Sequence, residues 1–122
     1  NLTYRNPRIV QRETPWGSSQ DTLQVDTLNS MTRQWTSQLV WGGLAVENLV
    51  QATARDLMAG AMMRLEMQGY PVIMSVHDEI ICEVPVDCGT LEEMVAIMTT
   101  VPAWAKGCPI AAEGKEGERY RK

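Results

Sequence analysis

The sequence predicts an α+β fold, in which an antiparallel sheet with a central acidic hairpin packs against one long and one shorter helix. Three observations support this fold class. Residues 43–68 carry apolar side chains at helical spacing, residues 72–84 form two apolar stretches around an acidic turn, and residues 90–100 repeat the helical pattern. The order helix, hairpin, helix places both helices on one face of the sheet.

The composition allows one modest core. The chain has 122 residues, of which 44% are hydrophobic, with eight Met and no Phe. This size corresponds to one domain or less, and the core must be mainly aliphatic and Met-filled. The formal net charge of -4 gives no hint of a nucleic-acid partner. It does not exclude one, because a site that gathers carboxylates around metal ions is itself acidic.

The cysteine spacing indicates reduced thiols, and the hydropathy pattern predicts no membrane-spanning segment. Cys82, Cys88 and Cys108 have no CxxC spacing, and with the single histidine they make a poor zinc set. We therefore expect reduced thiols in an intracellular protein. No signal peptide is visible, and no apolar run approaches the ~20 residues that cross a bilayer.

The first 41 residues are the least regular part of the chain. Short strands are expected at 2–4 and 8–10, around Asn6-Pro7. Residues 13–20 have the Pro, Gly and Ser content of a loop. Apolar residues recur at mixed spacings over 22–41, where we expect a hairpin.

The strongest helix pattern covers residues 43–68. Two glycines precede it, and Gly69-Tyr70-Pro71 ends it, because glycine suits the position past a helix and proline cannot continue one. Four apolar residues fall within one arc at a period of 3.6 and predict the core face: Val46, Val50, Leu57 and Ala61.

A polar line runs along the opposite side of this helix. Asn48, Gln51 and Arg55 stand at i, i+3 and i+7. One interpretation is an ordinary solvated face. The other is a row of donors for the DNA minor groove, where every base pair offers acceptors in nearly equivalent places. Such donors would hold any correctly shaped duplex without reading its sequence.

The acidic turn lies between the two apolar stretches of the hairpin. His77, Asp78 and Glu79 stand where a tight hairpin favours Asn-Gly or Asp-Gly. A sharp turn without glycine carries a conformational cost, and such costs tend to persist at functional sites. The turn is either a solvated charged loop or a carboxylate ligand for Mg²⁺.

The C-terminal part predicts three short elements. Leu91, Val95 and Met98 mark the helix over 90–100, and residues 102–105 suggest a helical turn. Residues 108–112 could form a last strand. A charged tail follows and ends with Arg119, Tyr120, Arg121 and Lys122.

Two of these motifs together resemble a known family. The helix segment Glu47–Leu57 (ENLVQATARDL), about twenty residues before Val76–Glu79 (VHDE), is similar to the C-terminal palm of family A DNA polymerases. These are the DNA polymerase I type, and the phage-like branch is most similar. The resemblance covers residues 42–122 as the C-terminal palm subdomain. Residues 1–41 resemble the segment that returns from the fingers to the palm.

The resemblance implies roles for individual residues. Asp78 matches the aspartate that ligates catalytic Mg²⁺, Glu79 its acidic neighbour, and His77 a histidine near the primer terminus. Asn48 and Gln51 match amides that contact the primer–template duplex in the minor groove. Arg55 extends this row by helical geometry alone. Where many members have a basic residue one turn before the asparagine, this chain has Leu44.

The resemblance also implies that the chain is part of a larger enzyme. Two-metal nucleotidyl transfer needs Mg²⁺, primer–template DNA, a dNTP and a second aspartate, which no strand here matches. The fingers are missing as well, and the chain begins at Asn1 rather than Met. We expect an inactive fragment in the cytoplasm of a bacterial host, encoded by a phage or prophage.

An incomplete palm would have an open sheet edge, which favours either a homodimer or a complementing upstream chain. The alternative function is a stand-alone, inactive palm-like binding or structural module, such as a prophage remnant. A small metal-dependent hydrolase built on residues 77–79 alone is disfavoured, because successive side chains alternate faces and cannot all reach one ion.

Overall fold

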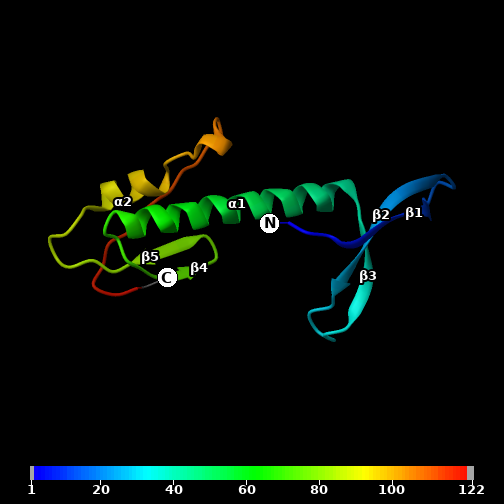
Figure 1. The fold of residues 1–122 in the computed structure, drawn as a ribbon, viewed down its shortest axis with the longest axis horizontal. Coiled ribbons are helices and arrows are strands. Elements are labelled where there is room, and N and C mark those ends of the chain that lie inside the picture. The colour runs from blue at the N-terminus through cyan, green and yellow to red at the C-terminus, as the bar shows by residue number, and fades with distance from the viewer. Residues whose placement is uncertain (1, 121–122) are drawn as a thin grey trace. The chain divides into compact units, whose positions relative to one another are not determined.

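The computed structural model of this protein describes residues 2–120, so Arg121 and Lys122 of the charged tail lie outside the described residues. The α+β class is confirmed, with two antiparallel sheets and two α-helices (Figure 1). The chain divides into two compact units, 1–53 and 54–122, and the boundary falls inside the long helix. The elements in chain order are β1 (Arg5–Glu13), β2 (Ser19–Leu28), β3 (Trp35–Val40), α1 (Gly42–Met67), β4 (Val72–Val76), β5 (Glu79–Cys82), α2 (Leu91–Met98) and the 3₁₀ turn η1 (Ala103–Ala105).

The first unit contains a three-stranded antiparallel sheet in the order β1-β2-β3. The hairpin expected over 22–41 is confirmed as β2 and β3. The segment is otherwise more regular than predicted, because the loop expected over 13–20 is limited to residues 14–18. Thr14 closes that turn, since its carbonyl oxygen accepts from Gly17 N at 3.0 Å and its hydroxyl lies 2.7 Å from that of Ser18. No strand forms at residues 2–4.

One face of this sheet carries the buried residues of the first unit. Val25 and Val40 have exposed fractions of 4% and 6%. Val40 pairs with Leu23, which lies two residues before Val25 on the same face of β2. The opposite face carries a polar network around Asp26. Its carboxylate accepts from Asn6 Nδ2 at 2.8 Å and from Arg8 Nη1 at 3.1 Å.

The second unit is built around three buried residues from different elements. Leu65 of α1 is fully buried and contacts Tyr70 and Ile97, while Val72 and Ile80 of the β4–β5 hairpin pack against the cluster. Figure 1 shows the C-terminal half of α1 alongside α2 and the hairpin. This small core therefore joins both helices to the acidic hairpin.

Side-chain caps hold α2 in place. Thr90 and Glu93 form a capping box at its N-terminus. The Tyr70 hydroxyl lies 2.9 Å from Glu93 Oε2 and accepts from Thr90 N at 3.0 Å. Burial, together with the neighbouring Glu93, raises the pKa of Tyr70. At the other end, Arg64 of α1 donates to the carbonyl oxygens of Ile97 and Thr100, at 3.3 and 3.1 Å.

The helix predictions were close, but the predicted core face of α1 was wrong over its first half. The predicted ranges 43–68 and 90–100 are observed as 42–67 and 91–98, and the helical turn near 103–105 is confirmed. Val46 and Val50, however, are 61% and 60% exposed, and the buried residues of α1 are Ala61 and Leu65. The periodicity correctly located a stripe of apolar residues. Among the described residues, however, only the C-terminal end of that stripe is buried.

The strand expected at 108–112 does not form. Cys108 N donates to Ala105 O at 2.9 Å and closes η1, and Pro109 has no N–H to offer a ladder. The chain then runs along α2, where a Cβ on Gly114 would lie 2.6 Å from Leu91 Cδ1. Within residues 2–120, no helix has both the length and the apolar character needed to cross a membrane.

The core predicts that shortening two different side chains of α1 to alanine changes the free energy of unfolding by unequal amounts. Leu65→Ala should lower the free energy of unfolding by about 2–5 kcal/mol, because Leu65 is fully buried. Met67→Ala removes a side chain that is 83% exposed and should change it by less than about 0.5 kcal/mol. Urea unfolding measures both values. Equal effects of the two variants would contradict the assignment of the core.

The Asp26 network predicts a pH dependence. The hydrogen bonds from Asn6 and Arg8 lower the pKa of Asp26 in the folded chain. The resulting stabilisation is present above the ordinary aspartate pKa of about 3.9 and is lost as the pH falls through the lower folded value. In Asp26→Asn, thermal stability should therefore decrease less between pH 7 and pH 3 than it does in the unaltered chain. In Asp21→Asn, the decrease should equal that of the unaltered chain. An unchanged loss in Asp26→Asn would contradict this origin.

Candidate metal and nucleic-acid site

The acidic turn is a two-residue connection between β4 and β5. Val76 pairs with Glu79, so His77 and Asp78 form the whole turn. His77 has a φ of +55°, a region that residues other than glycine seldom occupy. The conformational cost expected of a sharp turn without glycine is therefore carried by His77.

The core of the second unit supports the hairpin beneath this turn. Ile80 and Cys82 of β5 pack against it. At the base of the hairpin, Val72 N donates to the side-chain Oε1 of Glu66 on α1 at 2.7 Å. Burial raises the pKa of the Cys82 thiol, which is typical of an inert packed cysteine. The turn is thus the exposed tip of an anchored hairpin.

The three predicted turn residues are all exposed, and one of them has a partner from the far end of the chain. The carboxylate of Glu79 accepts a hydrogen bond from the Tyr120 hydroxyl, with an O···O distance of 2.7 Å. This bond raises the pKa of Tyr120, because the carboxylate favours the protonated phenol. Sequence reasoning missed the contact, since no local pattern relates residues 41 positions apart.

The donor set of the turn fits part of a magnesium site. Asp78 and Glu79 supply carboxylate oxygens, the ligands that Mg²⁺ prefers, but Mg²⁺ takes about six. Among residues 2–120, no three His, Cys, Asp or Glu side chains come together to hold a metal ion. The turn by itself would therefore offer one or two ligands to such an ion, and the remaining ligands would have to come from elsewhere, for example from water.

The predicted amides of α1 are each tethered by a neighbouring side chain. Asn48 Nδ2 donates to the Tyr4 hydroxyl at 3.1 Å, and Gln51 Nε2 donates to Glu47 Oε1 at 3.2 Å. Each amide group keeps a second N–H and its oxygen for another partner. Arg55 is exposed on the same helix.

These site residues fall in different units. Asn48 and Gln51 belong to the first unit, whereas Arg55 and the acidic turn belong to the second. The proximity of the amides to Asp78 therefore stays a prediction. Neither Tyr4 nor Glu47 is among the site residues predicted from the sequence. Glu47 could have been, because it stands at i−4 from Gln51.

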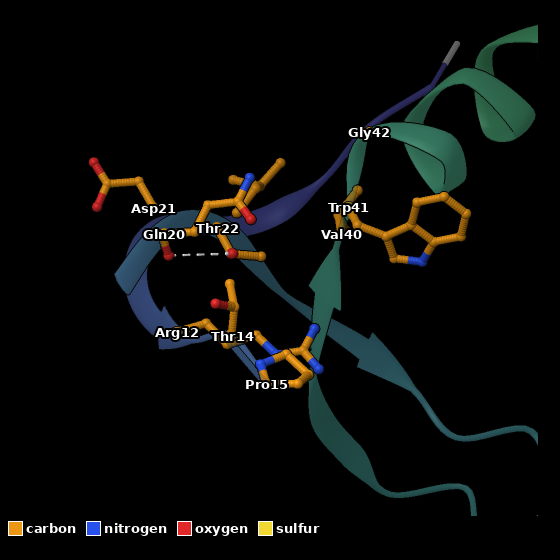
Figure 2. A pocket seen from close by; sticks show the side chains of 10 residues that line it. Arg12, Thr14, Pro15, Gln20, Asp21, Thr22, Val40, Trp41 and Gly42 are labelled. Atoms are coloured by element: carbon orange, nitrogen blue, oxygen red, sulfur yellow. Dashed lines mark hydrogen bonds between the residues drawn. The ribbon is translucent and has the colours of Figure 1, made fainter. Parts of the chain in front are cut away.

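Among the described residues, two hollows lie in the first unit. One, of 240 Å³, lies at an end of the sheet, where Arg12 of β1 and Gln20 and Thr22 of β2 line it with Trp41, which follows β3 (Figure 2). The other, of 410 Å³, is lined in part by Tyr4 and Asn48. Asn48 thus borders the second hollow.

The sequence is similar to that of a phage protein. Over 89 residues, 73% of this chain, the sequence is 44% identical to a protein named DNA polymerase from Bacillus phage SP02. The matched part is 14% of that relative, so the chain spans a small fraction of its length. No family model matches the sequence. No solved structure matches it either.

The turn geometry predicts that glycine is favoured at His77 and disfavoured two residues earlier, at Ser75. His77→Gly should raise the free energy of unfolding by up to about 1 kcal/mol, because glycine adopts a positive φ without the steric cost of a side chain. Ser75→Gly, in the regular part of β4, should lower it by about 0.5–1 kcal/mol. Thermal unfolding of both variants tests this. A larger loss in His77→Gly than in Ser75→Gly would contradict it.

Proposed function

We propose that this chain is the C-terminal palm segment of a phage-type family A DNA polymerase and contributes to template-directed nucleotidyl transfer in the host cytoplasm. The observation that carries the proposal is the 44% identity over 89 residues to a phage protein named DNA polymerase. Residues 42–122 form the palm part, and residues 1–41 are the segment that returns from the fingers.

Within this proposal, Asp78 is the metal-binding carboxylate. The tight turn supports this role, because a two-residue connection leaves the acid little freedom at the tip of an anchored hairpin. Glu79 supports the site, with Tyr120 restricting its carboxylate. His77 lies beside Asp78 in the turn and would face the primer terminus. Bound there, Mg²⁺ would activate the primer 3′-hydroxyl and offset charge on the transferred phosphate.

Asn48 and Gln51 would contact the primer–template duplex. The free N–H of each amide can donate to purine N3 or pyrimidine O2 in the minor groove, which any base pair offers. The tethers support this role, because Tyr4 and Glu47 restrict the rotamers of these amides before DNA binds. Arg55 would add a phosphate or groove contact further along α1.

The partners in this proposal are DNA, a dNTP and the upstream part of a polymerase. A second metal-binding aspartate and the fingers would come from that upstream part. The β4–β5 hairpin is a two-stranded sheet by itself, so each strand has an edge that another strand could pair with. We expect an upstream palm strand to pair with this edge. When that strand is missing, two copies of this chain would pair through the same edge instead.

A chimeric enzyme tests the proposed role of Asp78. This chain would replace the matching segment of the phage SP02 relative, and primer extension would be measured. Asp78→Asn should lower incorporation by about three orders of magnitude, since several kcal/mol of charge stabilisation depends on the metal ligands.

Asp87→Asn is the matched control, because Asp87 is an exposed carboxylate in the loop before α2 and should be neutral. Primer–template binding by the chimera verifies that it is folded. The assignment would be refuted if the folded chimera extended primers equally well with and without Asp78→Asn. It would also be refuted if the chimera bound the primer–template DNA but never extended the primer.

A further inference from the structure

The edge strand β1 contains an irregularity that changes which side chains share a face. Arg5 and Arg8 are three residues apart, so regular alternation would place them on opposite faces. The pairing register shifts between them: Arg5 pairs with Asp26 and Arg8 pairs with Gln24. Because Gln24 and Asp26 are two residues apart on β2, they share a face, and both arginines lie on it.

The irregularity comes at a conformational cost. Asn6 has a φ of +46°, and Pro7 has no N–H for the ladder. The side chain of Asn6 donates to Asp26 at 2.8 Å and holds the distorted segment against β2. Bulges of this kind commonly re-aim side chains and are retained for that effect.

The result is a row of arginines on one face of the sheet. Arg12 pairs with Gln20, which alternation places on the same face as Gln24 and Asp26. On the third strand, Trp35 pairs with Leu28 and belongs to this face too. We call it the arginine face and define it by the residues Arg5, Arg8, Arg12, Gln20, Gln24, Asp26, Trp35 and Ser37.

The arginine face is positively charged in a chain whose net charge is -4. Asp26 is its single carboxylate among the described strands, because Glu13 and Asp21 fall on the other face by alternation. Asp26 forms an ion pair with Arg8 at 3.1 Å. Arg5 and Arg12 therefore carry two positive charges with no ion-pair partner among residues 2–120.

The side chains around Arg8 are ordered by hydrogen bonds. Its guanidinium donates to Gln24 Oε1 at 2.7 Å, to Asp26 Oδ1 at 3.1 Å and to the Ser37 hydroxyl at 2.6 Å. This network spans all three strands of the sheet. Arg8 is therefore a fixed part of the surface, and Arg5 and Arg12 stand on either side of it along β1.

An exposed aromatic ring completes the face. Trp35 is 57% exposed, and the guanidinium carbon of Arg5 lies 4.4 Å from the centroid of its ring. Positive groups beside an exposed aromatic ring are the combination that proteins use to bind single-stranded nucleic acid without reading its sequence, because the charges follow the backbone and a base can stack on the ring. The amides of Gln20 and Gln24 are further donors for phosphate oxygens.

We propose that the arginine face binds the phosphodiester backbone of DNA, as a contact surface separate from the residues that would face the reacting nucleotide. The choice of DNA over another polyanion rests on the proposed function. On β2, the partners of Arg5 and Arg12 are Asp26 and Gln20, which are six residues apart. At about 3.3 Å per residue, Arg5 and Arg12 are therefore roughly 20 Å apart, a span of about six nucleotides of one strand.

Salt-dependent binding tests the proposal. The affinity of the chain for a fluorescent 16-base-pair duplex and for the matching single strand would be measured by anisotropy between 25 and 200 mM salt. Arg5→Gln with Arg12→Gln removes two phosphate contacts, so the slope of log K against log salt should become about 1.8 units shallower on the duplex. Arg8 stays unchanged, because its network supports the sheet.

Lys106→Gln with Lys115→Gln is the matched control, since it removes two exposed positive charges from the second unit. Its slope should stay that of the unaltered chain. Equal slopes for the arginine double variant and the unaltered chain would overturn the proposal. So would equal losses in both double variants, or no DNA binding by the unaltered chain at the lowest salt.

Two further outcomes separate this surface from other roles. If the arginine double variant self-associates in size-exclusion chromatography while DNA binding is unchanged, the arginines protect an edge strand and the proposal is wrong. Asn48→Ala with Gln51→Ala tests the duplex contacts of the proposed function independently. Loss of binding in that variant alone would overturn the arginine face and leave the proposed function standing.

Discussion

The acidic turn depends on a small core in which Leu65, Tyr70 and Ile97 bring together α1, the segment before β4, and α2. The β4–β5 hairpin has only two strands, and hairpins of that size are marginally stable in water without packing against another element. The core supplies that packing through Val72 and Ile80. The turn is consequently the exposed end of a supported element, and its backbone can hold a strained residue.

Three of the polar residues with proposed roles, Asn48, Gln51 and Glu79, share a feature that is independent of the relative placement of the two units. Asn48 is tethered to Tyr4, Gln51 to Glu47, and Glu79 to Tyr120. Each tether uses part of the hydrogen-bonding capacity of a side chain and leaves the remainder available. Restricting rotamers in this way before a ligand arrives lowers the entropic cost of binding.

The sequence predicted those elements whose formation depends on local patterns. Helical periodicity and the breaker Gly69-Tyr70-Pro71 located α1 within one residue at each end, and the apolar stretches located the acidic hairpin. Features set by distant partners were missed. The bulge at Asn6 aligns arginines only through pairing with β2, and Tyr120 reaches Glu79 across 41 positions. Exposure of Val46 was also unpredicted, because periodicity finds an apolar stripe but not what covers it.

A metal-binding role of the acidic turn is best tested by a Mn²⁺ titration of the ¹⁵N-labelled chain, in which the paramagnetic broadening of backbone amides is followed. If the turn binds a metal ion, the amides of Asp78 and Glu79 broaden first, and Asp78→Asn removes this early broadening. Other exposed acids of the second unit, Asp87 and Glu92, serve as internal references. Broadening that begins at those residues, or that persists in Asp78→Asn, would contradict a metal-binding role for the turn.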